Sequence, residues 1–76
     1  MIDDLDNIFF DTFRLGKDTD LDNLSSFILP KWDSLNHIKL IITIEKKFNI
    51  KFEAKIISEL NSYKKILEHL KKINVI

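Results

Sequence analysis

The side chains of this 76-residue chain whose types and spacing could support chemistry lie around Ser34. Asp33 and Ser34 close a loop rich in turn-forming residues, and residues 35–48 follow without glycine or proline. An Asp-Ser pair in this place predicts a helix N-terminus, because either side chain can accept hydrogen bonds from the first free N–H groups. Those N–H groups and the helix dipole would also stabilise a phosphodiester on the Ser34 hydroxyl. By itself, the pair predicts only a helix cap.

The residues around this pair resemble the attachment motif of the acyl carrier protein family. That motif is Asp-Ser-Leu at the start of the family's second helix, and here it reads Asp33-Ser34-Leu35. Trp32 precedes it, as in many carrier domains of secondary metabolism and surface-sugar pathways. The resemblance continues through a long helix ending in Phe48 and on through the C-terminal segment, so it covers nearly the whole chain.

The resemblance implies a carrier and not an enzyme. A phosphopantetheinyl transferase would attach 4′-phosphopantetheine to Ser34, and the terminal thiol would hold an acyl or aminoacyl group as a thioester. Asp33 would help the transferase to recognise the site, and Leu35 would anchor the loop or the docking surface. Acyl-loading and acyl-processing enzymes would dock near Ser34, where tethering raises the effective concentration of their substrate. The alternative is a helical protein-interaction module without a prosthetic group.

His37 lies one helical turn after Ser34, a spacing at which a histidine and a hydroxyl are neighbours. A hydrolase would also need a residue that orients the base, an oxyanion hole and a pocket, and the sequence has no pattern for them. We therefore predict no catalytic residue and expect His37 to be solvated or half-packed. The chain has no cysteine, which excludes disulfides and thiolate metal sites, and we predict no metal site.

The elements that must position Ser34 are predicted to be helices. Apolar residues recur at three- and four-residue intervals over about residues 3–15, 34–48, 54–60 and 62–73. This pattern predicts an all-α fold, a small four-helix bundle with three longer helices and one short helix. Residues 1–76 then form a single carrier domain. Gly16 is expected to end the first helix and Ser62 to cap the last.

The segment over residues 17–32 is predicted to be a loop that is fixed to the helices by its apolar residues. These are Leu21, Leu24, Phe27, Ile28 and Leu29. A short turn of helix is expected near residues 22–27. Pro30 disfavours helix at the residue before it, so the approach to Ser34 should be extended.

The predicted second helix has more apolar surface than a core needs, since its apolar residues cover more than half of its circumference. Leu35 and Ile42 lie along the spare edge. Two interpretations remain open, that the preceding loop covers this edge or that Ile42 faces a partner enzyme, and the resemblance favours the partner. The predicted docking residues are Ile42, Lys39 and Asn36. An Ile-rich set is expected to line the interior, namely Ile38, Ile41, Ile44, Ile57 and Ile66.

The formal net charge is zero but is unevenly distributed. Residues 1–34 carry eight Asp and three basic residues, whereas residues 35–76 carry four Glu and nine Lys. A basic half can indicate nucleic acid, but these lysines alternate with apolar residues and the chain has one arginine, so we predict no nucleic-acid partner. The second helix carries three lysines and one acid, unlike the acidic helix of fatty acid carriers. We therefore predict a specialised carrier for a polyketide, nonribosomal or surface-glycan pathway.

The hydropathy pattern adds three expectations. No run of apolar residues is long enough to span a bilayer, and no N-terminal apolar stretch follows a basic segment. We therefore expect a cytoplasmic protein that does not bind membranes. We also expect it to be a monomer.

Overall fold

The computed structural model describes residues 2–76 and holds five helical elements within them. These are α1 (Ile2–Phe13), the 3₁₀-helix η1 (Leu21–Asn23), α2 (Ser34–Phe48), α3 (Ala54–Glu59) and α4 (Tyr63–Lys72). No β-strand forms among residues 2–76, although Ser25 and Ser62 make an isolated antiparallel bridge. The predicted all-α bundle of three longer helices and one short helix is confirmed.

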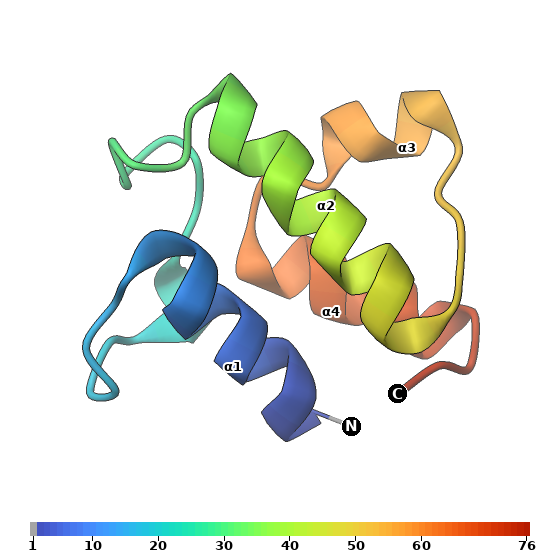
Figure 1. The fold of residues 1–76 in the computed structure, drawn as a ribbon, viewed down its shortest axis with the longest axis horizontal. Coiled ribbons are helices and arrows are strands. Elements are labelled where there is room, and N and C mark those ends of the chain that lie inside the picture. Colours follow the sequence, from blue (N-terminus) through green and yellow to red (C-terminus); the bar gives the residue numbers. More distant parts are fainter. Residues whose placement is uncertain (1) are drawn as a thin grey trace.

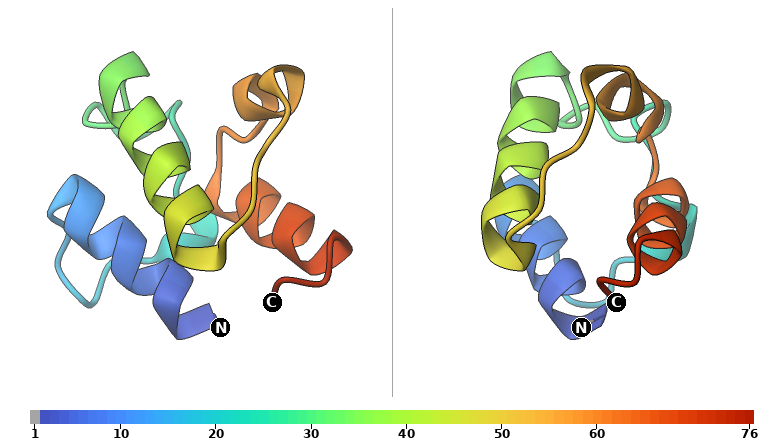
Figure 2. Two further views of the ribbon diagram at one scale, coloured as in Figure 1. Left: turned by 45° about the vertical axis from the view of Figure 1, so that its right-hand side comes forward. Right: turned by 90° about the vertical axis from the view of Figure 1, so that its right-hand side faces the viewer.

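The long helix α2 runs through the middle of the molecule (Figure 1). α1 packs along one side of α2, and α4 lies across the core from both helices in the two views of Figure 2. α3 stands level with the N-terminal half of α2 in the same views. Within the described part of the chain, no helix is both long and apolar enough to cross a bilayer.

α1 ends two residues earlier than predicted. The residue after Phe13 is Arg14, which adopts a left-handed backbone conformation with φ of 53°. The N–H of Leu15 then donates to the carbonyl of Phe10 at 3.0 Å, which closes the helix. The prediction that Gly16 ends the helix is therefore wrong, and Gly16 has no positive φ. Leu15 packs against the core. The chain therefore changes direction at Arg14, before it reaches Gly16.

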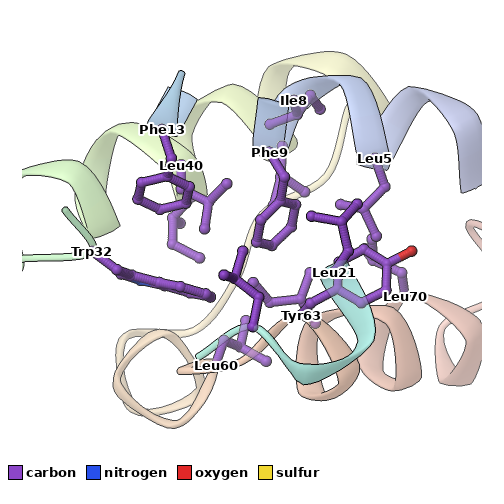
Figure 3. Close-up of a cluster of buried hydrophobic side chains, with 14 of the residues drawn as sticks. Leu5, Ile8, Phe9, Phe13, Leu21, Trp32, Leu40, Leu60, Tyr63 and Leu70 are labelled. Carbon is purple, nitrogen blue, oxygen red and sulfur yellow. The ribbon is translucent and has the colours of Figure 1, made fainter. Parts of the chain in front are cut away.

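Aromatic rings pack together in the part of the core between α1, the end of the loop at Trp32 and the start of α4. The Phe9 ring lies 5.6 Å from Trp32 and 5.2 Å from Tyr63 between ring centroids, both edge to face. Figure 3 shows side chains of α1 pointing toward these two rings. Such pairs contribute about 0.5–1.5 kcal/mol each beyond the burial of their area. The buried residues are Leu5, Ile8, Phe9, Phe13, Leu21, Leu24, Trp32, Leu40, Ile41, Ile44, Phe52, Leu60, Tyr63, Ile66 and Leu70.

Two predictions about burial are wrong. Phe27 and Ile28 were expected to fix the loop, but 84% and 64% of their surfaces are exposed. The backbone explains this, because Ile28 and Leu29 both donate to the carbonyl of Ser25 and form a tight turn with its tip in solvent. Ile38 was expected inside and is 48% exposed, because it points away from the side of α2 that packs on the core.

Leu21 and Leu24 are buried in the core and Leu29 packs against it, as predicted, and backbone hydrogen bonds also hold the loop to the linker between α3 and α4. The N–H of Ser26 donates to the carbonyl of Asn61 at 2.9 Å, and the N–H of Tyr63 donates to the carbonyl of Leu24 at 3.0 Å. Ser62 caps α4 as predicted, because its hydroxyl accepts from the N–H of Lys65 at 3.1 Å. These contacts place the loop and the start of α4 next to the N-terminus of α2.

Candidate functional site

The roles of Asp33 and Ser34 are divided at the start of α2. Asp33 is the N-cap residue, with extended backbone, and its Oδ1 accepts from the N–H of Asn36 at 2.9 Å. Ser34 is the first helical residue, and its side chain is exposed. Within residues 2–76 the Ser34 hydroxyl makes no hydrogen bond. The capping is therefore done by Asp33, and the Ser34 hydroxyl remains available to react.

The first backbone donors of α2 are also available. The earliest N–H groups with partners are those of Asn36, bound to the Asp33 side chain, and His37, bound to the Asp33 carbonyl at 2.8 Å. The N–H groups of Ser34 and Leu35 have no hydrogen-bond partner among the described residues. Free N–H groups at the positive end of a helix dipole favour an anion, so a phosphate attached to Ser34 would meet a favourable field.

A hollow of about 580 Å³ opens beside the Ser34 hydroxyl. The loop, the first turn of α2, the end of α3 and the linker between α3 and α4 supply its walls. The indole of Trp32 and the ring of Phe27 give it an apolar part, and hydroxyl and amide groups give it a polar rim. The lining residues are Ser26, Phe27, Trp32, Asp33, Ser34, His37, Ser58 and Asn61. This mixture suits a flexible chain that carries both amides and methylene groups.

His37, which lines this hollow, makes hydrogen bonds that connect α2 to the preceding loop and to α3. The indole N–H of Trp32 donates to His37 Nδ1 at 2.9 Å, and His37 Nε2 lies 2.8 Å from the carbonyl oxygen of Ile57 in α3. Because an indole nitrogen can only donate, Nδ1 must be unprotonated and Nε2 must carry the proton. Both ring nitrogens are therefore occupied by structural bonds. His37 is half-packed, as predicted, and neither nitrogen is left to accept a proton from Ser34.

The predicted docking residues lie in different surroundings. Leu35 and Ile42 are 68% and 44% exposed, so much of both side chains stays uncovered by the preceding loop. Lys39 is exposed on the same side of α2. Asn36 is half-buried, and its Nδ2 donates to the carbonyl of Lys31 at 2.8 Å, so its amide group stabilises the turn before α2. A docking role for these side chains stays a prediction.

Sequence reasoning missed four residues that line the hollow, namely Ser26, Phe27, Ser58 and Asn61. Phe27 was assigned to the interior and lines the hollow instead. The bond from His37 to Ile57 joins residues twenty positions apart, so no local pattern could reveal it. Trp32 and His37 are only five positions apart in the sequence, and this short separation was the signal that could have indicated their contact.

Comparison of this chain with family models, curated proteins and solved structures found no match. The geometry around Ser34 and the motif Asp33-Ser34-Leu35 are therefore the observations on which a function must be argued. Both concern the same few residues at the start of α2.

Proposed function

We propose that this protein is an acyl carrier protein whose 4′-phosphopantetheine group is attached to Ser34. The observation that supports this most directly is an exposed, unbonded hydroxyl on the first residue of α2, next to an aspartate that already caps the helix. A serine needed only as a cap would use its own oxygen to accept an N–H, and this serine does not.

The residues at the site fit the group. Ser34 would form the phosphodiester and lose its proton to a base on the transferase, while the adenosine bisphosphate half of coenzyme A leaves. The free N–H groups of Ser34 and Leu35 would stabilise the phosphate charge. The polar rim and apolar wall of the neighbouring hollow would hold the chain that follows. When bound, the group supplies a thiol that carries acyl or aminoacyl intermediates as thioesters.

Intact mass measured after incubation with coenzyme A and a broad-specificity phosphopantetheinyl transferase tests the proposal. We expect the mass to rise by one phosphopantetheine group in the wild-type chain and not at all in Ser34→Ala. Ser26→Ala and Ser58→Ala are matched controls, because both serines line the same hollow, and both variants should be modified. An unchanged wild-type mass, or modification that survives Ser34→Ala, would contradict the proposal.

We further propose that this carrier is a cytoplasmic monomer that serves a specialised pathway, with polyketide, nonribosomal or surface-glycan synthesis as the candidates. Its partners would be the transferase and enzymes that load and process the acyl group, and not nucleic acid or membranes. The first turn of α2 has no acidic residue, and exposed Lys39 and Lys46 follow on its surface. Because charge complementarity governs partner choice, enzymes with basic patches for an acidic helix should bind this protein poorly.

A competition measurement tests the specialised role. An acidic carrier of fatty acid synthesis and this protein, both with phosphopantetheine attached, would compete for a synthase enzyme that has a basic docking patch. We expect binding of this protein to be weaker by at least about tenfold at low salt. Equal binding would show that the protein can also serve fatty acid synthesis.

A helical interaction module without a prosthetic group is the second candidate. The observation that favours it is the apolar surface of α2, on which Leu35, Ile38 and Ile42 are all at least 44% exposed. Such a surface suits a protein partner whether or not Ser34 is modified. The mass measurement separates the two functions, since the module predicts an unmodified chain.

A further inference from the structure

The outer face of α2 carries a row of residues that nothing in the described part of the chain covers. Leu35, Ile38 and Ile42 are 68%, 48% and 44% exposed, and Lys39 and Lys46 are exposed between and after them. Their spacing of three, four and seven residues places them on one side of the helix, opposite the buried Ile44 side. We call these five residues the α2 stripe.

Ile42 stands at the centre of this stripe, between two shallow hollows that both include it. The hollow on the α1 side contains Arg14 and Lys39 with one acid, Asp11. The hollow on the other side contains Lys46 and Lys51 with one acid, Glu45. Ile42 is therefore a ridge with cations on both sides.

The carboxylates near the ridge do not balance these cations. Glu45 Oε2 already accepts from the N–H of Phe52 at 2.9 Å, so it is engaged with the backbone. Lys47 contributes little here, because its Nζ lies 3.9 Å from Asp4 of α1. Four cations and two carboxylates thus border Ile42, which leaves an excess of positive charge around an apolar ridge.

We propose that the α2 stripe docks a protein surface in which an apolar pocket for Ile42 is bordered by carboxylates. This inference rests on the proposed carrier function, since the partner would be an enzyme that acts on the group held at Ser34. Charge complementarity selects an acidic partner, and the apolar ridge selects a protein over nucleic acid, since phosphates would leave Leu35 and Ile42 without a matching surface.

Two designed helical peptides serve as probes. Both present the same leucine face, and they differ only in the flanking residues, which are Glu in one and Lys in the other. Each is titrated into the ¹⁵N-labelled protein, and backbone amide shifts report the place and strength of binding. We expect the Glu peptide to bind at least about tenfold more tightly at low salt, with shifts concentrated in α2 between Leu35 and Lys46.

Charge-reversal variants test whether the lysines of the α2 stripe cause the preference for the Glu peptide. Lys39→Glu combined with Lys46→Glu should abolish or reverse the preference for the Glu peptide. Lys64→Glu combined with Lys71→Glu makes the same charge change on exposed positions of α4 and should leave the preference intact. Ile42→Ala should weaken binding of both peptides and keep their order, because it removes apolar contact and no charge.

Several outcomes would overturn the inference. Equal affinity for the two peptides, shifts centred outside α2, or no binding of either peptide would each do so. Tighter binding to phosphatidylserine vesicles, with the same α2 shifts, would identify a lipid surface instead. Ser34→Ala leaves the stripe unchanged and should keep the peptide preference. A failed mass test with a preserved preference therefore rejects the carrier function alone, and the reverse pattern rejects the docking inference alone.

Discussion

At the scale of single residues, the site depends on two neighbouring side chains that do different work. Asp33 accepts the N–H of Asn36, and Ser34 keeps its hydroxyl free at the first helical position. If Ser34 were the cap, modification of its oxygen would remove a stabilising hydrogen bond. Because Asp33 is the cap, the Ser34 oxygen can be esterified without loss of that bond.

The cap makes a prediction about stability. Asp33→Ala should lower the free energy of unfolding by about 1 kcal/mol, because the N–H of Asn36 loses its acceptor. Asp33→Asn is the matched control and should cost less, since asparagine is also a preferred N-cap residue. Urea unfolding followed by circular dichroism measures both changes. If Asp33→Ala is as stable as the wild type, Asp33 is not the main cap.

At the scale of elements, the short helix α3 is the least firmly held. None of its six residues is buried, and the apolar Ile56 and Ile57 are only partly covered. One of its fixed contacts is the hydrogen bond from His37 to the carbonyl of Ile57 at 2.8 Å. α3 and the linker after it border the hollow beside Ser34, so motion of α3 would change the shape of that hollow.

Hydrogen exchange should reveal this difference in stability. Amides of α3 are expected to exchange faster than those of α4 around Ile66 and Leu70, because a helix with few buried contacts opens at lower free energy. His37→Ala should speed exchange in α3 further and leave α1 less affected. His37→Gln is the control, since glutamine can both accept and donate a hydrogen bond. Equal exchange rates in α3 and α4 would show that the contacts of α3 hold it as firmly as burial holds α4.

At the scale of the whole molecule, a side-chain hydrogen bond joins the first helix, α1, to the last helix, α4. The Tyr63 hydroxyl at the start of α4 donates to Asp6 Oδ1 in α1 at 2.6 Å. Burial raises the pKa of the Tyr63 hydroxyl well above its ordinary value, and the hydrogen bond and negative charge of Asp6 raise it further. The neutral form of Tyr63 is therefore the form that the fold favours.

This raised pKa gives stability a dependence on alkaline pH. Above about pH 10 the unfolded chain releases the Tyr63 proton while the folded chain keeps it, so the unfolded state binds fewer protons. The free energy of unfolding must then fall as pH rises, by up to about 1.4 kcal/mol per pH unit from this group. Below that pH the contribution is fully present.

Tyr63→Phe separates this effect from the titration of lysines. At neutral pH the variant should be less stable than the wild type by about 1 kcal/mol, because the bond to Asp6 is lost. The difference should shrink between about pH 9 and about pH 11, since only the wild type loses the Tyr63 contribution. Urea unfolding at both pH values measures it. A constant difference would mean that Tyr63 titrates alike in both states.

Local sequence signals predicted the positions of α1 to α4 and placed the candidate site at the start of α2. Apolar periodicity located α1, α2, α3 and α4 within residues 2–76, and α2 begins at Ser34 and ends at Phe48 as predicted. The cap at Ser62 was also predicted, because a cap depends on residues within one helical turn. Such signals are local, so neighbouring residues contain them.

Which apolar residues are buried and which long-range bonds form depends on how the helices pack against one another. Ile38 and Ile44 are alike in type and share one helix, yet one is half exposed and the other is fully buried, because α1 and α4 cover a single side of α2. The bond from His37 to Ile57 likewise exists because packing brings α3 beside α2. Burial and such contacts depend on the relative positions of distant segments, which no stretch of sequence specifies alone.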